Sequence, residues 1–124
     1  MRHHVFGKSL GREKDERTAL RRLLITQLFE HDSIRTTHAK ATAVRGQAER
    51  LITLAKNGNA AGGAKMVHAR RLAAARLSDP VAVRKLFDDI APRFTNRPGG
   101  YTRVTHLGLR QGDASEMVLL ELVE

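Results

Sequence analysis

THAKATAVRGQAERLITLAKN, residues 37–57, carries the clearest structural signal in this chain of 124 residues. Its apolar residues recur at alternating intervals of three and four, which is the spacing of one helix face. These positions are Ala41, Val44, Ala48, Leu51 and Ala55. Thr37 stands just before them and is suited to cap a helix N-terminus. The stretch therefore predicts a helix over residues 38–57 with one buried face.

The segment before this helix predicts a second helix and a short strand. In residues 15–31, Asp15 and Glu16 suit a first turn, where the helix dipole favours acidic groups. Leucines at 20, 24 and 28 then share one face. Ser-Ile-Arg-Thr at 33–36 is β-prone and predicts a small strand.

The segment after it predicts a break, further helices and a hairpin. Asn-Gly-Asn-Ala-Ala-Gly-Gly at 57–63 predicts a chain break, because Asn and Gly tolerate left-handed backbone. Further helices are expected over 64–77 and from Pro80, capped by Ser78 or Asp79, to near Pro92. Apolar residues then alternate with period two, which predicts strands over 101–110 and 116–123.

Together these elements predict an α+β fold, with about four helices packed on a small, mainly antiparallel sheet that ends in a C-terminal β-hairpin. Residues 1–14 (MRHHVFGKSLGREK) have no helical period and are expected to form an extended basic arm. Residues 15–124 are expected to form a single domain, because this length supports only one core. The absence of Cys excludes a disulfide scaffold, a Cys zinc site and a thiol nucleophile.

The charge of the chain points to a polyanionic partner. The 22 Lys and Arg residues outnumber the 13 Asp and Glu residues, so the formal net charge is +9. Residues 50–78 and 90–112 contain ten cations between them and no carboxylate. We expect these cations to remain unneutralised and to attract phosphates, which favours nucleic-acid binding over a merely solvated basic face.

The stretch RFTNRPGGYTR at 93–103 is the strongest candidate for contact with RNA. It combines Arg93, Arg97 and Arg103 with Gly99, Gly100 and Tyr101. Glycines let the backbone approach a phosphate closely, and Arg matches phosphate geometry with two parallel donors. Tyr101 can stack on an unpaired base or bond a ribose. The alternative is a tight turn entering a strand, with Tyr101 covering the core; both interpretations can hold together.

A second candidate is the N-terminus of the central helix. Helix N-termini present free N–H groups and a positive dipole end, which suit a phosphate. Four polar side chains surround this one, namely Arg35, Thr36, Thr37 and Lys40. A plain threonine cap is an equally good interpretation.

Other polar groups carry weaker signals. His3 and His4 are adjacent, so in an extended arm their side chains point apart, and no metal site is expected. Consecutive residues cannot form a catalytic triad, so His31-Asp32-Ser33 is interpreted as a helix end. A metal-dependent nuclease would need more clustered carboxylates than Asp88-Asp89 provides. A DNA-binding architectural protein is the runner-up, although no recognition helix is evident.

Several ordered fragments resemble one known family. They are Met1-Arg-His, TTxAKA from Thr36, LITLAK from Leu51, KLF from Lys85, PRF from Pro92, RPGGYTR from Arg97, Gly112-Asp and ELV from Glu121. This ordered set is similar to the L-seventeen family of bacterial-type large-subunit ribosomal proteins. The resemblance spans nearly the whole chain, and RPGGYTR and LITLAK are its most specific parts.

The resemblance implies a non-enzymatic building block of the large ribosomal subunit that binds and orders rRNA near the polypeptide exit. It implies rRNA and neighbouring ribosomal proteins, such as the L-thirty-two family, as partners. No cofactor, small-molecule substrate or membrane contact is expected, and the cytoplasmic ribosome of a bacterium is favoured over an organellar one. The residues expected to contact rRNA are Arg2, His3, His4, Lys8, Arg12, Arg17, Arg21, Arg22, Arg35, Thr36, Thr37, Lys40, Arg45, Arg93, Arg97, Gly99, Gly100, Tyr101 and Arg103.

Overall fold

The computed structural model describes residues 9–123 and confirms the α+β class. In chain order the elements are α1 (Lys14–His31), β1 (Ser33–Thr37), α2 (His38–Ala61), α3 (Gly63–Leu77), α4 (Pro80–Lys85), the π-helical turn η1 (Leu86–Ile90), α5 (Ala91–Arg93), β2 (Thr102–Leu109) and β3 (Glu116–Leu122). Most of the expected basic arm, with Arg2, His3, His4 and Lys8, lies outside the described residues.

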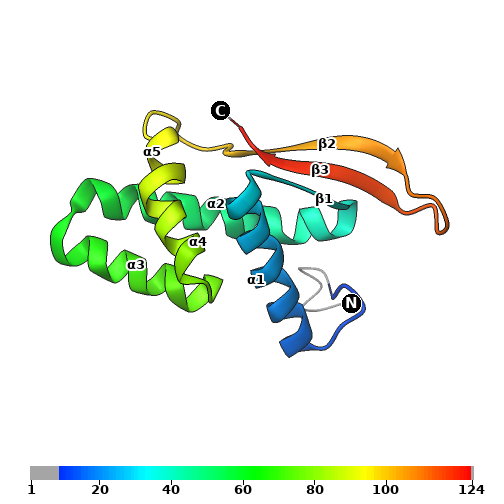
Figure 1. Ribbon diagram of the computed structural model, residues 1–124, viewed down its shortest axis with the longest axis horizontal. Coiled ribbons are helices and arrows are strands. Elements are labelled where there is room, and N and C mark those ends of the chain that lie inside the picture. Colours follow the sequence, from blue (N-terminus) through cyan, green and yellow to red (C-terminus); the bar gives the residue numbers. More distant parts are fainter. Residues whose placement is uncertain (1–8, 124) are drawn as a thin grey trace, which may run out of the picture.

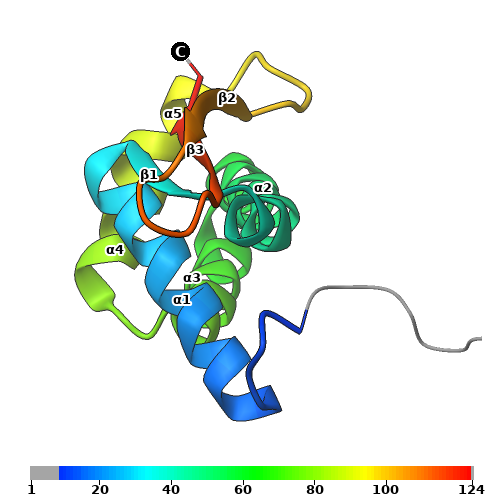
Figure 2. The ribbon, with the colours of Figure 1, turned by 90° about the vertical axis from the view of Figure 1, so that its right-hand side faces the viewer.

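The three described strands form one antiparallel sheet in the order β1-β3-β2. Figures 1 and 2 show the helices gathered on one side of this sheet, while the β2–β3 hairpin extends beyond them. Along β3, Val118, Leu120 and Leu122 are buried and alternate with more exposed residues. The C-terminal period-two pattern therefore identified both the hairpin and the face that it buries.

The centre of the core is α2, as its sequence predicts. All five expected seam residues are buried, from Ala41 through Leu51 to Ala55. The cap is also as expected, because the Thr37 hydroxyl accepts a hydrogen bond from the Lys40 backbone N–H at 3.4 Å. Phe29 of α1, Phe87 of η1 and Leu120 of β3 complete the core around this helix.

The predicted chain break at 57–63 is wrong in extent. Helix α2 continues to Ala61 and ends only at Gly62, whose φ of 66° is left-handed. Gly58 is buried so closely that an added Cβ would lie 2.7 Å from the Cβ of Ala69. The side-chain amide of Asn59 donates to the carbonyl of Phe87 at 2.8 Å. These tertiary contacts hold residues of low helix propensity in a helix.

The connection from α3 to α4 follows its sequence signals. Ser78 ends α3 with a φ of 62°, and the Asp79 carboxylate accepts from the Val81 N–H at 3.0 Å, with Pro80 in the first turn. From Pro80 the helical chain runs through η1 to Arg93. It buries Leu86 and Ile90, among others, against the other helices.

Candidate nucleic-acid interface

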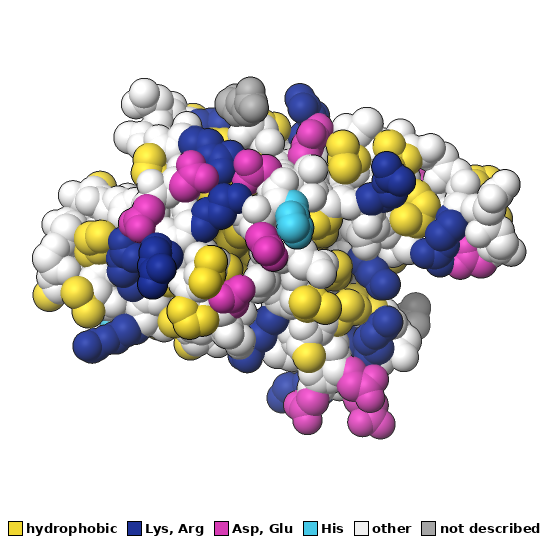
Figure 3. All heavy atoms as spheres, in the orientation of Figure 1, with side chains coloured by type: hydrophobic (Ala, Val, Ile, Leu, Met, Phe, Trp, Pro, Cys, Tyr) yellow, Lys and Arg dark blue, Asp and Glu magenta, His cyan; other side chains and the backbone are white. Residues whose placement is uncertain are grey.

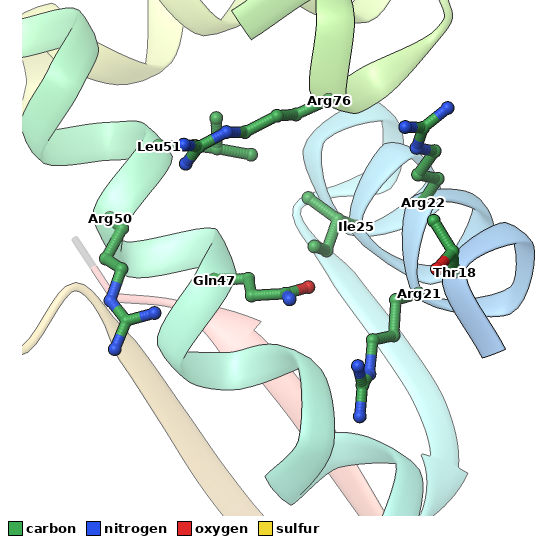
Figure 4. A pocket seen from close by; sticks show the side chains of 8 residues that line it. All are labelled: Thr18, Arg21, Arg22, Ile25, Gln47, Arg50, Leu51 and Arg76. Carbon is green, nitrogen blue, oxygen red and sulfur yellow. The ribbon is translucent and has the colours of Figure 1, made fainter. Parts of the chain in front are cut away.

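Four arginines surround one hollow between α1, α2 and α3. Arg21 and Arg22 come from α1, Arg50 from α2 and Arg76 from α3. The hollow has a volume of about 360 Å³, and its lining is completed by Thr18, Ile25, Gln47 and Leu51. In Figure 4, Gln47 and Ile25 face one another across its middle and the arginines are distributed around its edge. We call these four residues the arginine cluster.

The local sequence explains why these arginines meet. Arg50 directly precedes the buried Leu51, and Arg76 directly precedes the buried Leu77. Arg21 and Arg22 lie within one turn of the buried Leu24. Each arginine therefore stands at the border of an apolar helix face. When those faces pack together, their borders meet and the cationic side chains gather along the seam.

The arginine cluster has no acidic residue in its lining. Within residues 9–123, neither Arg50 nor Arg76 forms an ion pair with a carboxylate. Arg22 donates to the Ser78 hydroxyl at 3.1 Å, which leaves its positive charge uncompensated. Guanidinium groups arranged in this way suit an anion with several oxygen acceptors, such as a phosphate.

The sequence predicted half of this cluster. Arg21 and Arg22 were expected to contact RNA, whereas Arg50 and Arg76 were not among the expected site residues. Both were nevertheless visible as members of the window at 50–78 that contains no carboxylate. Their position directly before a seam residue is the additional signal that could have identified them.

Arg93 lies in a different environment from the one that the sequence indicated. Its guanidinium contacts the carboxylates of Asp32 at 3.1 Å and Asp89 at 3.0 Å, and the Lys85 ammonium lies 3.4 Å from Asp32. Burial opposes ionisation of Asp32, but the hydrogen bonds and charges of Arg93 and Lys85 lower its pKa below the usual value. Figure 3 shows basic and acidic side chains intermingled over this region, around α4 and α5. Arg93 thus joins the end of α1 to the end of α5.

The expectation that the cations of 90–112 remain unneutralised is therefore wrong for three of them. Besides Arg93, Arg103 lies 2.9 Å from the Glu121 carboxylate, and Arg110 pairs with Asp113 in the hairpin turn. None of these carboxylates lies inside the window. The fold brings Glu121 from β3 and Asp32 from the residue after α1, which a local count of charges could not anticipate. Asp89 and Asp113, by contrast, directly flank the window and pair with arginines four and three residues away.

Arg97 shapes the RPGGYTR loop. Its Nε donates to the carbonyls of Gly99 and Gly100 at 3.2 and 3.1 Å, and Gly100 has a left-handed φ of 62°. Arg97 and Arg103 also line one shallow pocket together with Glu121. The structure thus brings these two predicted residues together, with a carboxylate beside them.

Tyr101 lies in the core. Tyr101 is only 2% exposed, and its ring packs against the ring of Phe94, with the two centroids 5.1 Å apart. The phenolic oxygen accepts a hydrogen bond from the Lys56 ammonium at 2.9 Å, which lowers the Tyr101 pKa against the opposing effect of burial. This is the arrangement that the core interpretation predicts, and a ring so enclosed has no face available for a base.

The four residues at the N-terminus of α2 do not converge. Thr36 is buried, whereas its neighbour Arg35 is exposed on the opposite face of β1. The Thr37 hydroxyl is already occupied as the cap of Lys40. The plain cap, which the sequence left open, accounts for this geometry.

Two further predicted cations, Arg45 of α2 and Arg17 of α1, make contacts within the protein. Arg45 donates to the Thr102 hydroxyl at 3.1 Å and lies 3.5 Å from the Glu49 carboxylate. The Arg17 side chain donates to the carbonyl of Arg12 at 3.1 Å, which connects the chain before α1 to its first turn. These arginines therefore have structural contacts in addition to their charge.

Across residues 9–123, no group of three His, Cys, Asp or Glu side chains is arranged to hold a metal ion. None of the helices described has the length and apolar character needed to cross a membrane.

Comparison with known proteins supports the resemblance. A family model described as "Ribosomal protein L17" matches residues 20–123. The chain belongs to this family. A large ribosomal subunit protein bL17 from Symbiobacterium thermophilum is 50% identical over 94% of this chain and 96% of its own length. Its counterpart in Pelobacter propionicus is 46% identical over all of this chain and 92% of the relative. The bL17 protein of Syntrophotalea carbinolica is 47% identical over all of this chain and 76% of its own length.

Proposed function

We propose that this chain is a structural, non-catalytic component of the large ribosomal subunit, and that it binds and orders large-subunit rRNA through the arginine cluster. The observation that supports this proposal is the convergence of four guanidinium groups from three helices on a hollow without an acidic residue in its lining. Membership of the L17 family, whose relatives are named large-subunit proteins, supports large-subunit rRNA as the polyanion.

The physical mechanism is charge neutralisation on a fixed scaffold. Each arginine that contacts a phosphate releases condensed counterions, and this term dominates the affinity of such proteins for nucleic acids. The helices hold the arginines at set separations, because Leu24, Leu51 and Leu77 beside them are buried. A set of cations at fixed separations recognises the shape of folded RNA rather than its base sequence.

The other predicted contacts extend this surface. Arg12, Arg17, Arg35, Lys40, Arg45, Arg97 and Arg103 supply additional positive charge in the described chain. Arg2, His3, His4 and Lys8, which lie outside the described residues, are proposed to contact rRNA as well. A position near the polypeptide exit, an L-thirty-two neighbour and a bacterial cytoplasmic ribosome belong to the same proposal and rest on the family resemblance.

The test is RNA affinity as a function of salt concentration. Wild-type protein and the double variant Arg50→Ala/Arg76→Ala are titrated with purified large-subunit rRNA. The variant should bind more weakly. The slope of log affinity against log salt concentration should also be less steep by about 1 to 2, because each phosphate contact contributes nearly 1 to that slope. Folded rRNA should also compete better than duplex DNA, which distinguishes this proposal from an architectural DNA-binding protein.

The matched control is Arg70→Ala/Arg110→Ala, which also removes two positive charges. Both control arginines are paired with carboxylates, namely Asp88 and Asp113. A general dependence on net charge would weaken both double variants equally. That outcome would contradict a specific role for the arginine cluster.

A further inference from the structure

A second hollow lies on the other side of α3, where α3 packs beside α4. Its volume is about 530 Å³, and much of its lining is apolar. The apolar part comprises Val67, Ala74, Pro80 and Val83. Val67 is 48% exposed, and the neighbouring Val81 is 66% exposed. We call this hollow the α3–α4 groove.

Three arginines line the α3–α4 groove alongside its apolar residues, namely Arg70, Arg71 and Arg84. Arg70 pairs with Asp88 at 2.9 Å, and its guanidinium lies 4.8 Å from the ring centroid of Phe87. Within residues 9–123, Arg71 and Arg84 form no ion pair with a carboxylate. Figure 3 shows hydrophobic side chains beside basic ones over α3 and α4.

The one acidic residue of the lining, Asp79, has a structural role. Its carboxylate caps α4 by accepting from the Val81 N–H at 3.0 Å. Among the described residues it forms no ion pair with Arg71 or Arg84, so the two arginines outweigh its single negative charge. The groove combines an apolar floor with uncompensated positive charge, and both features are complementary to a segment that carries hydrophobic and acidic side chains together.

RNA fits this groove less well than a protein does. The lining holds no aromatic ring on which a base could stack, so a base would have only the guanidinium groups of the three arginines to stack on. Exposed aliphatic side chains such as Val67 and Ala74 gain nothing from contact with hydrated phosphates. Contact with other apolar side chains is favourable, because it removes their apolar surface from water. An amphipathic helix supplies such side chains at intervals of three and four residues, as in other grooves of this type.

We propose that the α3–α4 groove is a docking surface for an acidic amphipathic helical segment of another protein. Hydrophobic side chains of that segment would cover the exposed Val67, Ala74 and Pro80. Its carboxylates would pair with Arg71 and Arg84. The lining of this groove shares no residue with the lining of the arginine cluster, although Arg22 of the cluster donates to Ser78 of the groove. The inference does not depend on the rRNA-binding proposal.

The probe is a synthetic helical peptide of about 18 residues, with Leu at positions i, i+3, i+4 and i+7 and Glu elsewhere. A second peptide has the same leucines with Lys in place of Glu. Binding to the full chain is measured by fluorescence anisotropy. We expect the acidic peptide to bind at least tenfold more tightly than the basic one.

Three variants locate the bound peptide. Val67→Asp and Arg84→Glu should each weaken binding of the acidic peptide at least tenfold. Leu107→Asp is the matched control, because Leu107 is also 48% exposed but lies on the β-hairpin. It should bind the peptide as wild type does. Circular dichroism verifies that all three variants remain folded.

Each alternative gives a distinct result that would overturn the proposal. Loss of peptide binding in Arg50→Ala/Arg76→Ala but not in Val67→Asp would place the peptide at the arginine cluster. Equal affinity for the acidic and the basic peptide would show that the arginines of the groove do not select acidic partners. Loss of RNA affinity in Val67→Asp would assign the groove to RNA. Self-association of the wild type that Val67→Asp abolishes would assign the groove to a second copy of this chain.

Discussion

The Lys56 ammonium lies 2.9 Å from the phenolic oxygen of Tyr101 and also donates to the carbonyl of Arg97. One side chain of α2 thus forms hydrogen bonds with both the buried ring and the loop that precedes it. Because Tyr101 directly follows the two glycines of RPGGYTR, this contact determines how the loop enters β2.

Tyr101→Phe should lower the free energy of unfolding by about 0.5–1.5 kcal/mol, because it removes one partly buried hydrogen bond and keeps the ring. The affinity for rRNA should not change, since the ring is in the core. Denaturant unfolding and RNA titration of the same variant provide the two measurements. A drop in RNA affinity without a loss of stability would instead support contact between the phenol and a ribose.

Gly58→Ala should destabilise the protein by about 1–3 kcal/mol, because the new methyl group would overpack the contact between α2 and α3. The added Cβ would lie 2.7 Å from the Cβ of Ala69. Gly46→Ala is the control in the same helix, where an added Cβ meets nothing within 4 Å. It should stabilise the protein by about 0.5–1 kcal/mol through helix propensity. Urea unfolding of both variants checks this, and a stabilised Gly58→Ala would contradict the packing argument.

The same pair of glycines shows why α2 was predicted only in part. The seam from Ala41 to Ala55 is a property of local spacing, and it identified the helix without further information. The extension to Ala61 depends on a contact between Gly58 and Ala69, which belongs to another helix. From the sequence alone, Gly58 resembles any glycine of a chain break.

The charges of the candidate site, like the extent of α2, were predicted only in part. Windows without carboxylates correctly indicated Arg50 and Arg76 as uncompensated charges. The same argument was wrong for Arg70 of the same window, which pairs with Asp88 at 2.9 Å. It was also wrong for Arg93, whose partner Asp32 lies 61 residues away in the chain. Charge along the sequence therefore predicts the surface only where the fold does not bring a distant carboxylate to it.

Asp32→Asn should destabilise the protein by about 0.5–1 kcal/mol at pH 7, a modest figure because the Asp32 side chain is 46% exposed and solvent screens its ion pairs. The pKa of Asp32 is lower in the folded protein than in the unfolded chain. Its contribution is therefore present above about pH 4 and is lost as the pH falls below that value. Asn tolerates the left-handed backbone at this position, where φ is 65°.

Urea unfolding at pH 7 and pH 3 measures this contribution. The difference between wild type and Asp32→Asn should shrink at the lower pH. Glu30→Gln is the control, because its carboxylate contacts only the exposed His31, at 3.7 Å, among the described residues. A difference for Asp32→Asn that is the same at both values of pH would show that the ion pairs with Arg93 and Lys85 do not stabilise the fold.

Arg97→Ala/Arg103→Ala should weaken rRNA binding, but less than Arg50→Ala/Arg76→Ala does. The Arg103 guanidinium lies 2.9 Å from Glu121, so part of its charge is already neutralised before any phosphate arrives. Glu121→Gln removes that neutralisation and should therefore tighten RNA binding, with a steeper dependence on salt. Titrations of all three variants with large-subunit rRNA at several salt concentrations give the ranking. If Arg97→Ala/Arg103→Ala binds as wild type does, the loop at 93–103 makes no contact with rRNA.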